Sequence, residues 1–157
     1  FIPIFKKYYN NISSGDDMVN IKYNSNLNEG SFSEIISSSI SKDRFVQYTT
    51  KGIHKDDLEF LIDGNKIKNF GSQGQQKSFL VSLKLAQFEY YKEKLGSSPI
   101  VLLDDIFDKL DQDRVRQIVN ILEKNEFGQI FITDTHKERV ENALKDSSNK
   151  EEIFNIE

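Results

Sequence analysis

Two adjacent carboxylates after an apolar run are the residues that most directly suggest chemistry. Asp104 and Asp105 follow the apolar run at 100–103. Such a run predicts a strand buried on both faces of a parallel sheet, and ligands of open α/β folds bind at the carboxyl edge of that sheet. One carboxylate there could hold the water shell of Mg²⁺, and its neighbour could orient or deprotonate an attacking water. A polar turn after an ordinary strand would leave the same pattern, so this motif alone leaves both interpretations open.

A loop with two glycines forms a second candidate site. The run FGSQGQQK at residues 70–77 leads into a helix expected at 75–95. Exposed N–H groups and the positive end of a helix attract anions. Ser72 adds a hydroxyl donor, and Gly71 and Gly74 would let phosphate oxygens approach the backbone. An N-cap serine with turn glycines is the structural alternative.

The same region must be distinguished from a P-loop. Residues 71–78 match G-x-x-x-x-G-K-[ST] except that Gln76 replaces the second glycine, which would obstruct the wrapping of the backbone around phosphates. A P-loop also follows a buried strand, whereas the run KIKNF at 66–70 is short and polar. No other stretch of the chain fits the pattern. We therefore expect no P-loop in these 157 residues.

The surrounding pattern predicts an α/β scaffold for both motifs. In the C-terminal half, strands alternate with helices, which is the order of a βαβ unit with parallel strands and flanking helices. Upstream, Asp63, Gly64 and Asn65 predict a hairpin turn, and Gly96 ends the long helix. We expect helices at 2–13, 32–41, 75–95, 112–123 and 136–144, and strands at 18–23, 45–50, 58–62, 100–103, 129–133 and 152–156.

Composition limits the class of protein. A length of 157 residues suits one domain. The net charge of −4 offers no basic face of the kind that a free-standing nucleic-acid binder carries. No apolar run approaches the roughly 20 residues of a membrane span, and the lack of cysteine suits a reducing cytosol. The chain starts at Phe1 and not at a methionine, so we expect a fragment or a processed product.

The motifs, taken in their order, resemble those of ABC-type ATPases. Residues 71–75 look like the signature L-S-G-G-Q, with Gly71 in place of leucine and Gln73 in place of the first glycine. Residues 100–105 look like the Walker B strand, and the run DKLD at 108–111 looks like the D-loop that follows it. Agreement of several motifs in one order is far more specific than any of them alone.

The variant residues narrow this resemblance. The runs SQGQQK and LLDDIFDKLD, together with GIHKDD at 52–57, resemble the RecF family of bacterial recombination-repair proteins, which are related to SMC heads. The resemblance is densest over residues 48–136. It implies that residues 1–16 end an inserted helical arm. Residues 17–157 would then form the C-terminal part of an ABC-type ATPase head that lacks the Walker A portion.

The resemblance also implies an ATPase that is active as a dimer, with ATP bound between two subunits. Asp104 would be the Mg²⁺ ligand and Asp105 the catalytic carboxylate that polarises water. Turnover would be slow, because aspartate is one methylene shorter than the glutamate of many ABC proteins. The D-loop residues would be Asp108 and Asp111, the latter on the dimer seam. The residues that bind the ATP of the partner would be those of the signature: Ser72, Gln73, Gly74 and Gln75.

Both histidines have open interpretations. His136 follows the strand expected at 129–133, near the place of the ABC switch histidine, and could sense the γ-phosphate. Thr133 or Asp134 could fill that role instead, or His136 could be a helix N-terminal residue without function. His54 lies in the GIHKDD segment and could be structural, or lie near the nucleotide or the arm. Two histidines without cysteine cannot form a zinc site by themselves.

For the complete protein, the resemblance implies ATP- and Mg²⁺-dependent dimerisation, and DNA binding near junctions of single- and double-stranded DNA. It further implies help in recombinase loading during gap repair in the cytoplasm, within the SOS response. Recombination mediator proteins would be further partners, and no membrane is involved. The isolated chain should not hydrolyse ATP, because it has no P-loop. The alternatives are an SMC-like ATPase head of another repair protein, or a non-catalytic module that dimerises or docks a partner.

Overall fold

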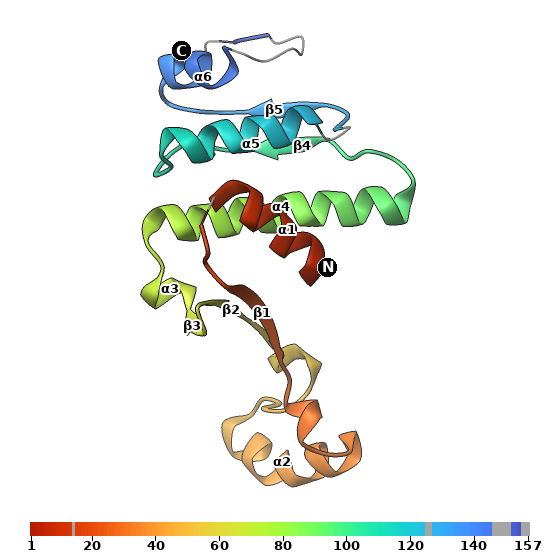
Figure 1. Cartoon of the computed structure of the whole chain (residues 1–157). Helices are drawn as coiled ribbons and strands as arrows, with labels where there is room; N and C mark the ends of the chain where they lie inside the picture. Colours follow the sequence, from red (N-terminus) through yellow and green to blue (C-terminus); the bar gives the residue numbers. More distant parts are fainter. Residues whose placement is uncertain (14, 125–126, 146–151, 155–157) are drawn as a thin grey trace.

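A long helix, α4 (Gln73–Leu95), runs through the middle of the molecule, with other elements on its two sides (Figure 1). The computed structural model describes residues 1–13, 15–124, 127–145 and 152–154. Helix α4 begins after the N-cap Ser72, two residues earlier than expected, and ends at Gly96 in the left-handed conformation. Packing from both sides explains why its buried apolar side chains lie on several faces: Phe79, Val81, Leu85, Ala86 and Phe88.

Helix α1 (Ile2–Ser13) crosses α4 and confirms the helix expected at 2–13 (Figure 1). Apolar residues at helical spacing place one face of α1 in the core. Phe5 packs against Phe79 of α4, with ring centroids 4.6 Å apart. The buried residues of this face are Phe5, Tyr8, Tyr9 and Ile12.

Antiparallel strands form the first sheet, in the order β1 (Val19–Asn24), β2 (Asp57–Ile62) and β3 (Asn65–Lys66). The strands expected at 18–23 and 58–62 are confirmed to within one residue. Asp63 and Gly64 join β2 to β3 with positive φ angles of 48° and 77°, the type I′ geometry that an Asp-Gly pair favours. The expected hairpin is therefore confirmed, and the short helix α3 (Ile67–Phe70) follows it.

Helix α2 (Phe32–Val46) corrects two expectations. It continues beyond residue 41, and the strand expected at 45–50 is wrong. Gln47 ends the helix in the left-handed conformation, and Asp43 then accepts hydrogen bonds from the backbone N–H and the hydroxyl of Thr50 (2.9 and 2.6 Å). These bonds fold the chain back over the helix end, so no extended segment forms. Short 3-10 turns lie on either side of α2, at η1 (Asn26–Glu29) and η2 (Ile53–Lys55).

The C-terminal half is the expected βαβ unit, with two parallel strands and flanking helices. Val101 lies opposite Ile130 in the register of the two strands. Each element begins and ends within one residue of its expected bounds. The elements are β4 (Val101–Leu103), α5 (Gln112–Lys124), β5 (Ile130–Ile132) and α6 (Lys137–Leu144).

This small sheet is buried on one face only, which corrects the expectation of a strand covered on both faces. Val101 and Leu103 lie in the core with side chains of α4 and α5. Leu102 is 73% exposed and Phe131 is 49% exposed. Successive side chains of a strand point to opposite faces, so the described helices cover one face and leave the other open.

The remaining strand expectation concerns the end of the chain. Residues 152–154 do not form the strand expected at 152–156, and residues 155 and 156 lie outside the described residues. Within the described part of the chain, the structure contains no helix that is long and apolar enough to cross a membrane.

Candidate functional site

The glycine loop at residues 71–75 forms the start of α4. The Oγ of Ser72 accepts a hydrogen bond from the N–H of Gln75 (3.2 Å), and the N–H of Ser72 donates to Oε1 of Gln75 (2.8 Å). This reciprocal pair is a capping box. The N–H groups of Gln73 and Gly74 belong to the first turn and have no carbonyl partner within the helix. Together with the hydroxyl hydrogen of Ser72, they are donors that an anion at this helix end could use.

The side chain of Gln75 is turned back into the protein. Its Oε1 accepts from Ser72, and its Nε2 donates to Oδ1 of Asp17 (3.2 Å) in the segment between α1 and β1. Both ends of the amide are therefore engaged by the protein. Among the signature residues, the hydroxyl of Ser72 and the backbone of Gln73 and Gly74 remain as donors for a ligand.

Gly74 packs tightly against α5 and the loop before it. A Cβ at this position would overlap Nη1 of Arg114 and would lie 3.4 Å from the carbonyl oxygen of Lys109. Nε of Arg114 lies 3.6 Å from Oδ2 of Asp111, and the N–H of Arg114 donates to Oδ1 of the same carboxylate (2.9 Å). The glycine loop therefore touches the segment that resembles the D-loop, and only glycine fits at residue 74 without moving Arg114.

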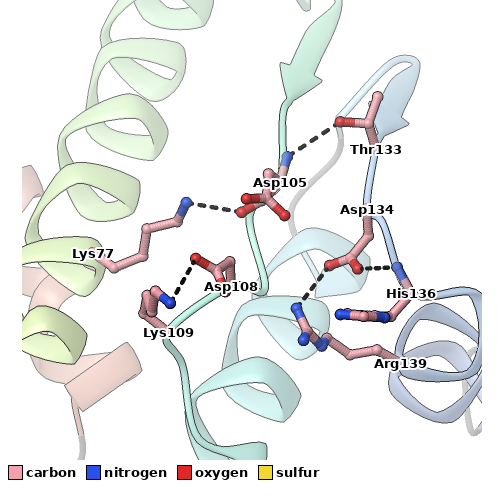
Figure 2. Close-up of polar contacts among 8 residues, drawn as sticks. All are labelled: Lys77, Asp105, Asp108, Lys109, Thr133, Asp134, His136 and Arg139. Carbon is pink, nitrogen blue, oxygen red and sulfur yellow. Dashed lines mark hydrogen bonds and ion pairs between the residues drawn. The ribbon is translucent and has the colours of Figure 1, made fainter.

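The acidic pair lies where β4 ends, at the carboxyl edge of the parallel strands. The hydroxyl of Thr133, after β5, donates to Oδ1 of Asp104. The N–H of Asp105 donates to the carbonyl and hydroxyl oxygens of Thr133 (3.0 and 3.2 Å), and Nζ of Lys77 donates to the carbonyl oxygen of Asp105 (2.8 Å; Figure 2). Asp105 has a positive φ of 47°, a conformation that costs a non-glycine residue roughly 1–2 kcal/mol. Thr133 and Lys77 hold this backbone from two sides.

The D-loop candidates divide between the two motifs. The N–H of Asp108 donates to the carbonyl oxygen of Asp105 (3.3 Å), and its carboxylate forms an exposed ion pair with Lys109 (3.7 Å; Figure 2). Asp111 instead accepts from the first turn of α5 and so caps that helix. The structure thus brings Asp108 into contact with Asp105, and Asp111 close to the glycine loop through Arg114.

The switch candidates lie in different surroundings. Thr133 contacts both acidic residues, as described above. The carboxylate of Asp134 is fully buried and accepts hydrogen bonds from the N–H of His136 (2.7 Å) and from Nη1 of Arg139 (3.3 Å), so it holds the start of α6 (Figure 2). His136 is the exposed N-cap residue of α6, and its ring lies on the α6 side of Asp134, away from Asp105 (Figure 2). Of these residues, Thr133 is the one in contact with the acidic pair.

His54 closes a local turn in η2. Its Nε2 lies 3.0 Å from the carbonyl oxygen of Thr49. Gly52 has a φ of 124°, and a Cβ there would lie 3.3 Å from the imidazole, so glycine suits this position. In the part of the chain that the structure describes, no three His, Cys, Asp or Glu side chains are grouped to hold a metal ion.

The sequence patterns placed Lys77 in the glycine loop without giving it a role, and they missed Arg114 and Asp17. Lys77 offered a usable signal, because it lies one helical turn after Gln73 and on the same face of α4. Asp17 and Arg114 offered none. Their contacts with Gln75 and Gly74 join segments that are far apart in the sequence.

Comparison with curated proteins identifies close relatives, although no family model matches the chain. The DNA replication and repair protein RecF of Flavobacterium johnsoniae is 51% identical over 156 residues, which cover 99% of this chain and 44% of that protein. The RecF of Bacteroides thetaiotaomicron is 43% identical over 157 residues, which cover 100% of the chain and 42% of that protein. The chain thus spans about two fifths of the length of the curated relatives it matches.

Solved structures agree with these relatives. The structure described as the recombination mediator protein RecF-ATPrS in the RecFOR pathway has a TM-score of 0.65 and 26% identity, over 86% of this chain and 38% of that one. An SMC head bound to the C-terminal winged-helix domain of ScpA has a TM-score of 0.51 at 17% identity, over 89% of this chain and 35% of that one, and shows the fold alone. The expected α/β class, with parallel strands and flanking helices, is confirmed. In its sequence and in its fold, the chain is similar to about two fifths of the DNA replication and repair proteins named RecF.

Proposed function

We propose that this chain is part of a DNA-repair ATPase that binds ATP between two subunits and hydrolyses it slowly. The loop at the start of α4 would contact the ATP held by the partner, and the acidic pair would serve the ATP held by its own subunit. The observation that supports the proposal most is a combination of two sites in a chain that is 51% identical to a RecF protein. An acidic pair lies at the carboxyl edge of β4, and helix N–H groups without a carbonyl partner in the helix lie at the start of α4.

The donor set at the end of β4 fits Mg²⁺ and not a transition metal. Asp104 is exposed and next to the hydroxyl of Thr133, and the described residues hold no cluster of three strong ligands there. Mg²⁺ keeps several waters and is usually bound through one or two carboxylates plus substrate phosphates. We assign Asp104 as its protein ligand. When bound, the ion would neutralise charge on the phosphates of ATP.

Asp105 is the proposed catalytic carboxylate. Its N–H and carbonyl groups are both held, by Thr133 and Lys77, so the backbone fixes the position from which the side chain extends. A carboxylate at this place would orient an attacking water and accept its proton. Thr133 is the preferred switch residue because it contacts both members of the pair, with His136 and Asp134 as the other candidates.

The signature loop supplies the proposed contact in trans. Its donors for phosphate would be the hydroxyl of Ser72 and the N–H groups of Gln73 and Gly74. The absence of a side chain at Gly74 makes room for Arg114, which packs against the loop. Gln75 would support the loop through its capping box. Asp108 and Asp111 would belong to the D-loop, with Asp111 at the seam between the subunits.

DNA is the proposed partner of the assembled protein, since the relatives are named DNA replication and repair proteins and a structural neighbour is described as a recombination mediator. The net charge of −4 suggests that other parts of the complete protein make the DNA contacts. Residues 1–16 would be the end of a helical arm. We propose the cytoplasm as the location and recombinational gap repair, within the SOS response, as the process, with recombination mediator proteins as further partners.

The test uses the complete protein, because this chain spans about two fifths of its relatives. Asp105→Asn should abolish ATP hydrolysis and leave ATP-dependent dimerisation intact, whereas Asp104→Asn should weaken both in the presence of Mg²⁺. Asp113→Asn is the matched control, because this carboxylate is 84% exposed on α5. Hydrolysis is followed by phosphate release and dimerisation by light scattering. If both activities survive both substitutions, the proposed site is wrong.

A further inference from the structure

A continuous chain of hydrogen bonds leads from the buried face of α1 to the start of α4. The hydroxyl of Tyr9 donates to Oδ2 of Asp17 (2.8 Å). Oδ1 of Asp17 accepts from Nε2 of Gln75 (3.2 Å), and Oε1 of Gln75 accepts from the N–H of Ser72 (2.8 Å). One carboxylate therefore joins a helix in the core to the loop that resembles the ABC signature.

The Tyr9 end of this series of hydrogen bonds is fixed in the core. Tyr9 has no exposed surface, and its ring packs against Phe79 of α4 with centroids 6.1 Å apart. Burial and the neighbouring Asp17 raise the pKa of Tyr9, so its hydroxyl keeps its proton and remains a donor. The charged groups that act on this hydroxyl are Asp17, Arg114 and Asp63. The position of Asp17 is thus set by a residue that cannot move unless α1 moves.

The other side of the loop is held by α5. Arg114 occupies the space where a Cβ of Gly74 would lie, and it pairs with Asp111 at the start of α5. Asp17 holds the loop from one side through its hydrogen bond to Gln75, and Arg114 packs against the loop from the other side at Gly74. Because the capping bonds between Gln75 and Ser72 define the first turn of α4, any change at Asp17 reaches the donors of Ser72, Gln73 and Gly74.

We propose that Asp17 is a positioning residue that ties the signature loop to α1, so that the geometry of the phosphate donors depends on how α1 is docked. The side chain of Gln75 then works from behind the loop, as the acceptor and donor that connect Ser72 to Asp17. The consequence for ATP rests on the function proposed above. A partner or ligand that displaces α1 would loosen the loop and weaken ATP-dependent dimerisation.

The hydrogen bond between Gln75 and Asp17 can be tested by exchanging its donor and its acceptor. In Asp17→Asn, the new amide can accept from Tyr9 but then presents its NH₂ group to Nε2 of Gln75, a donor against a donor. In Gln75→Glu, two carboxylates meet instead. The double variant restores an N–H···O bond with the roles reversed, and the new Glu side chain can still accept from the N–H of Ser72. Asp16→Asn, at the neighbouring exposed carboxylate, is the matched control.

Hydrogen–deuterium exchange in the peptide covering residues 71–77 of the complete protein reads the loop directly, without ATP. We expect Asp17→Asn and Gln75→Glu each to speed exchange there about tenfold, since a hydrogen bond to a charged group is lost. The double variant should return to within about twofold of the wild type, and Asp16→Asn should not change it. Tyr9→Phe keeps the buried ring and should speed exchange less than Asp17→Asn does. This variant replaces Asp17→Asn in the test if the charge change at Asp17 prevents folding.

The connection is refuted if Asp17→Asn leaves exchange at 71–77 unchanged, or if the double variant exchanges as fast as the single ones. ATP-dependent dimerisation, measured on the same samples by light scattering, should fall and recover in parallel. If the wild type does not dimerise with ATP while the exchange pattern appears as expected, the proposed function fails and the positioning role of Asp17 stands.

Discussion

Gly74→Ala tests the most crowded point of the glycine loop at the start of α4. The wild-type residue leaves space that Nη1 of Arg114 fills, and a methyl group there would overlap this nitrogen. The carbonyl oxygen of Lys109, 3.4 Å from the new Cβ, is backbone and moves less easily. Nη1 is the end of a flexible side chain, so we expect Arg114 to swing away from the loop and from Asp111.

The effect on folding stability should be small, because two terms oppose each other. The ion pair that Arg114 forms with Asp111 is partly exposed, so its loss costs at most about 1 kcal/mol. Replacing glycine by alanine in a helix gains up to about 1 kcal/mol. The melting temperature should therefore stay within roughly 3 °C of the wild type.

The effect on nucleotide contact should be large. The methyl group would stand beside the N–H donors of the first turn, and the displaced guanidinium would no longer brace the loop. We expect ATP-dependent dimerisation to weaken at least about tenfold, a loss of the size that one or two hydrogen bonds to phosphate would explain.

Differential scanning fluorimetry and light scattering with and without ATP, on the complete protein, measure the two quantities. Gly128→Ala is the matched control, because a Cβ there would meet only Ser98 at an ordinary distance of 3.5 Å. Dimerisation of Gly74→Ala at the wild-type ATP concentration would mean that crowding at residue 74 does not disturb the nucleotide contact. A loss of several kcal/mol of stability would mean that Arg114 cannot move aside. Either result contradicts the prediction.

Other changes probe the scaffold and the acidic pair. Lys77→Met keeps the length of the side chain but removes the hydrogen bond to the carbonyl oxygen of Asp105, so steady-state hydrolysis should fall about three- to tenfold with ATP-dependent dimerisation retained. Leu85→Ala empties a fully buried site in α4 and should cost about 2–5 kcal/mol in urea unfolding. Burial raises the pKa of Tyr8 and Tyr9 above the ordinary value of 10.0, so stability should fall as pH rises above that value, where the unfolded chain ionises first. Tyr9→Phe should reduce that slope in alkaline unfolding curves.

Much of the fold followed from local patterns in the sequence. Ser72 and Gly96 mark the ends of α4 through capping chemistry that acts within a few residues, and Asp63 with Gly64 specifies a two-residue hairpin. The strand expected at 45–50 failed because its apolar and aromatic residues suit either a helix end or a strand. A side-chain contact from Asp43 to Thr50 decided between them.

The site was predictable only in part, for the same physical reason. Asp104 and Asp105 could be found because an apolar strand followed by carboxylates is a local motif. Lys77 binds the backbone of a residue 28 positions away, and Gln75 binds Asp17 across 58 positions. No short-range pattern in the sequence predicts such pairs. Local patterns therefore give the glycine loop and the acidic pair as two separate motifs. In the structure, Lys77 of α4 connects them through its hydrogen bond to the carbonyl oxygen of Asp105.

Under the proposed function, Ser72 and Asp105 of one chain serve different ATP molecules, and mixing two inactive variants tests this arrangement. Ser72→Arg blocks the signature loop, and Asp105→Asn removes the catalytic carboxylate. In a mixed dimer of the complete protein, sharing in trans leaves one site with both defects and the other site intact. An equal mixture should therefore recover about a quarter of wild-type hydrolysis, since random pairing makes half the dimers mixed. If the mixture stays as inactive as each variant alone, Ser72 and Asp105 do not serve opposite sites, and the proposed sharing of ATP between subunits is wrong.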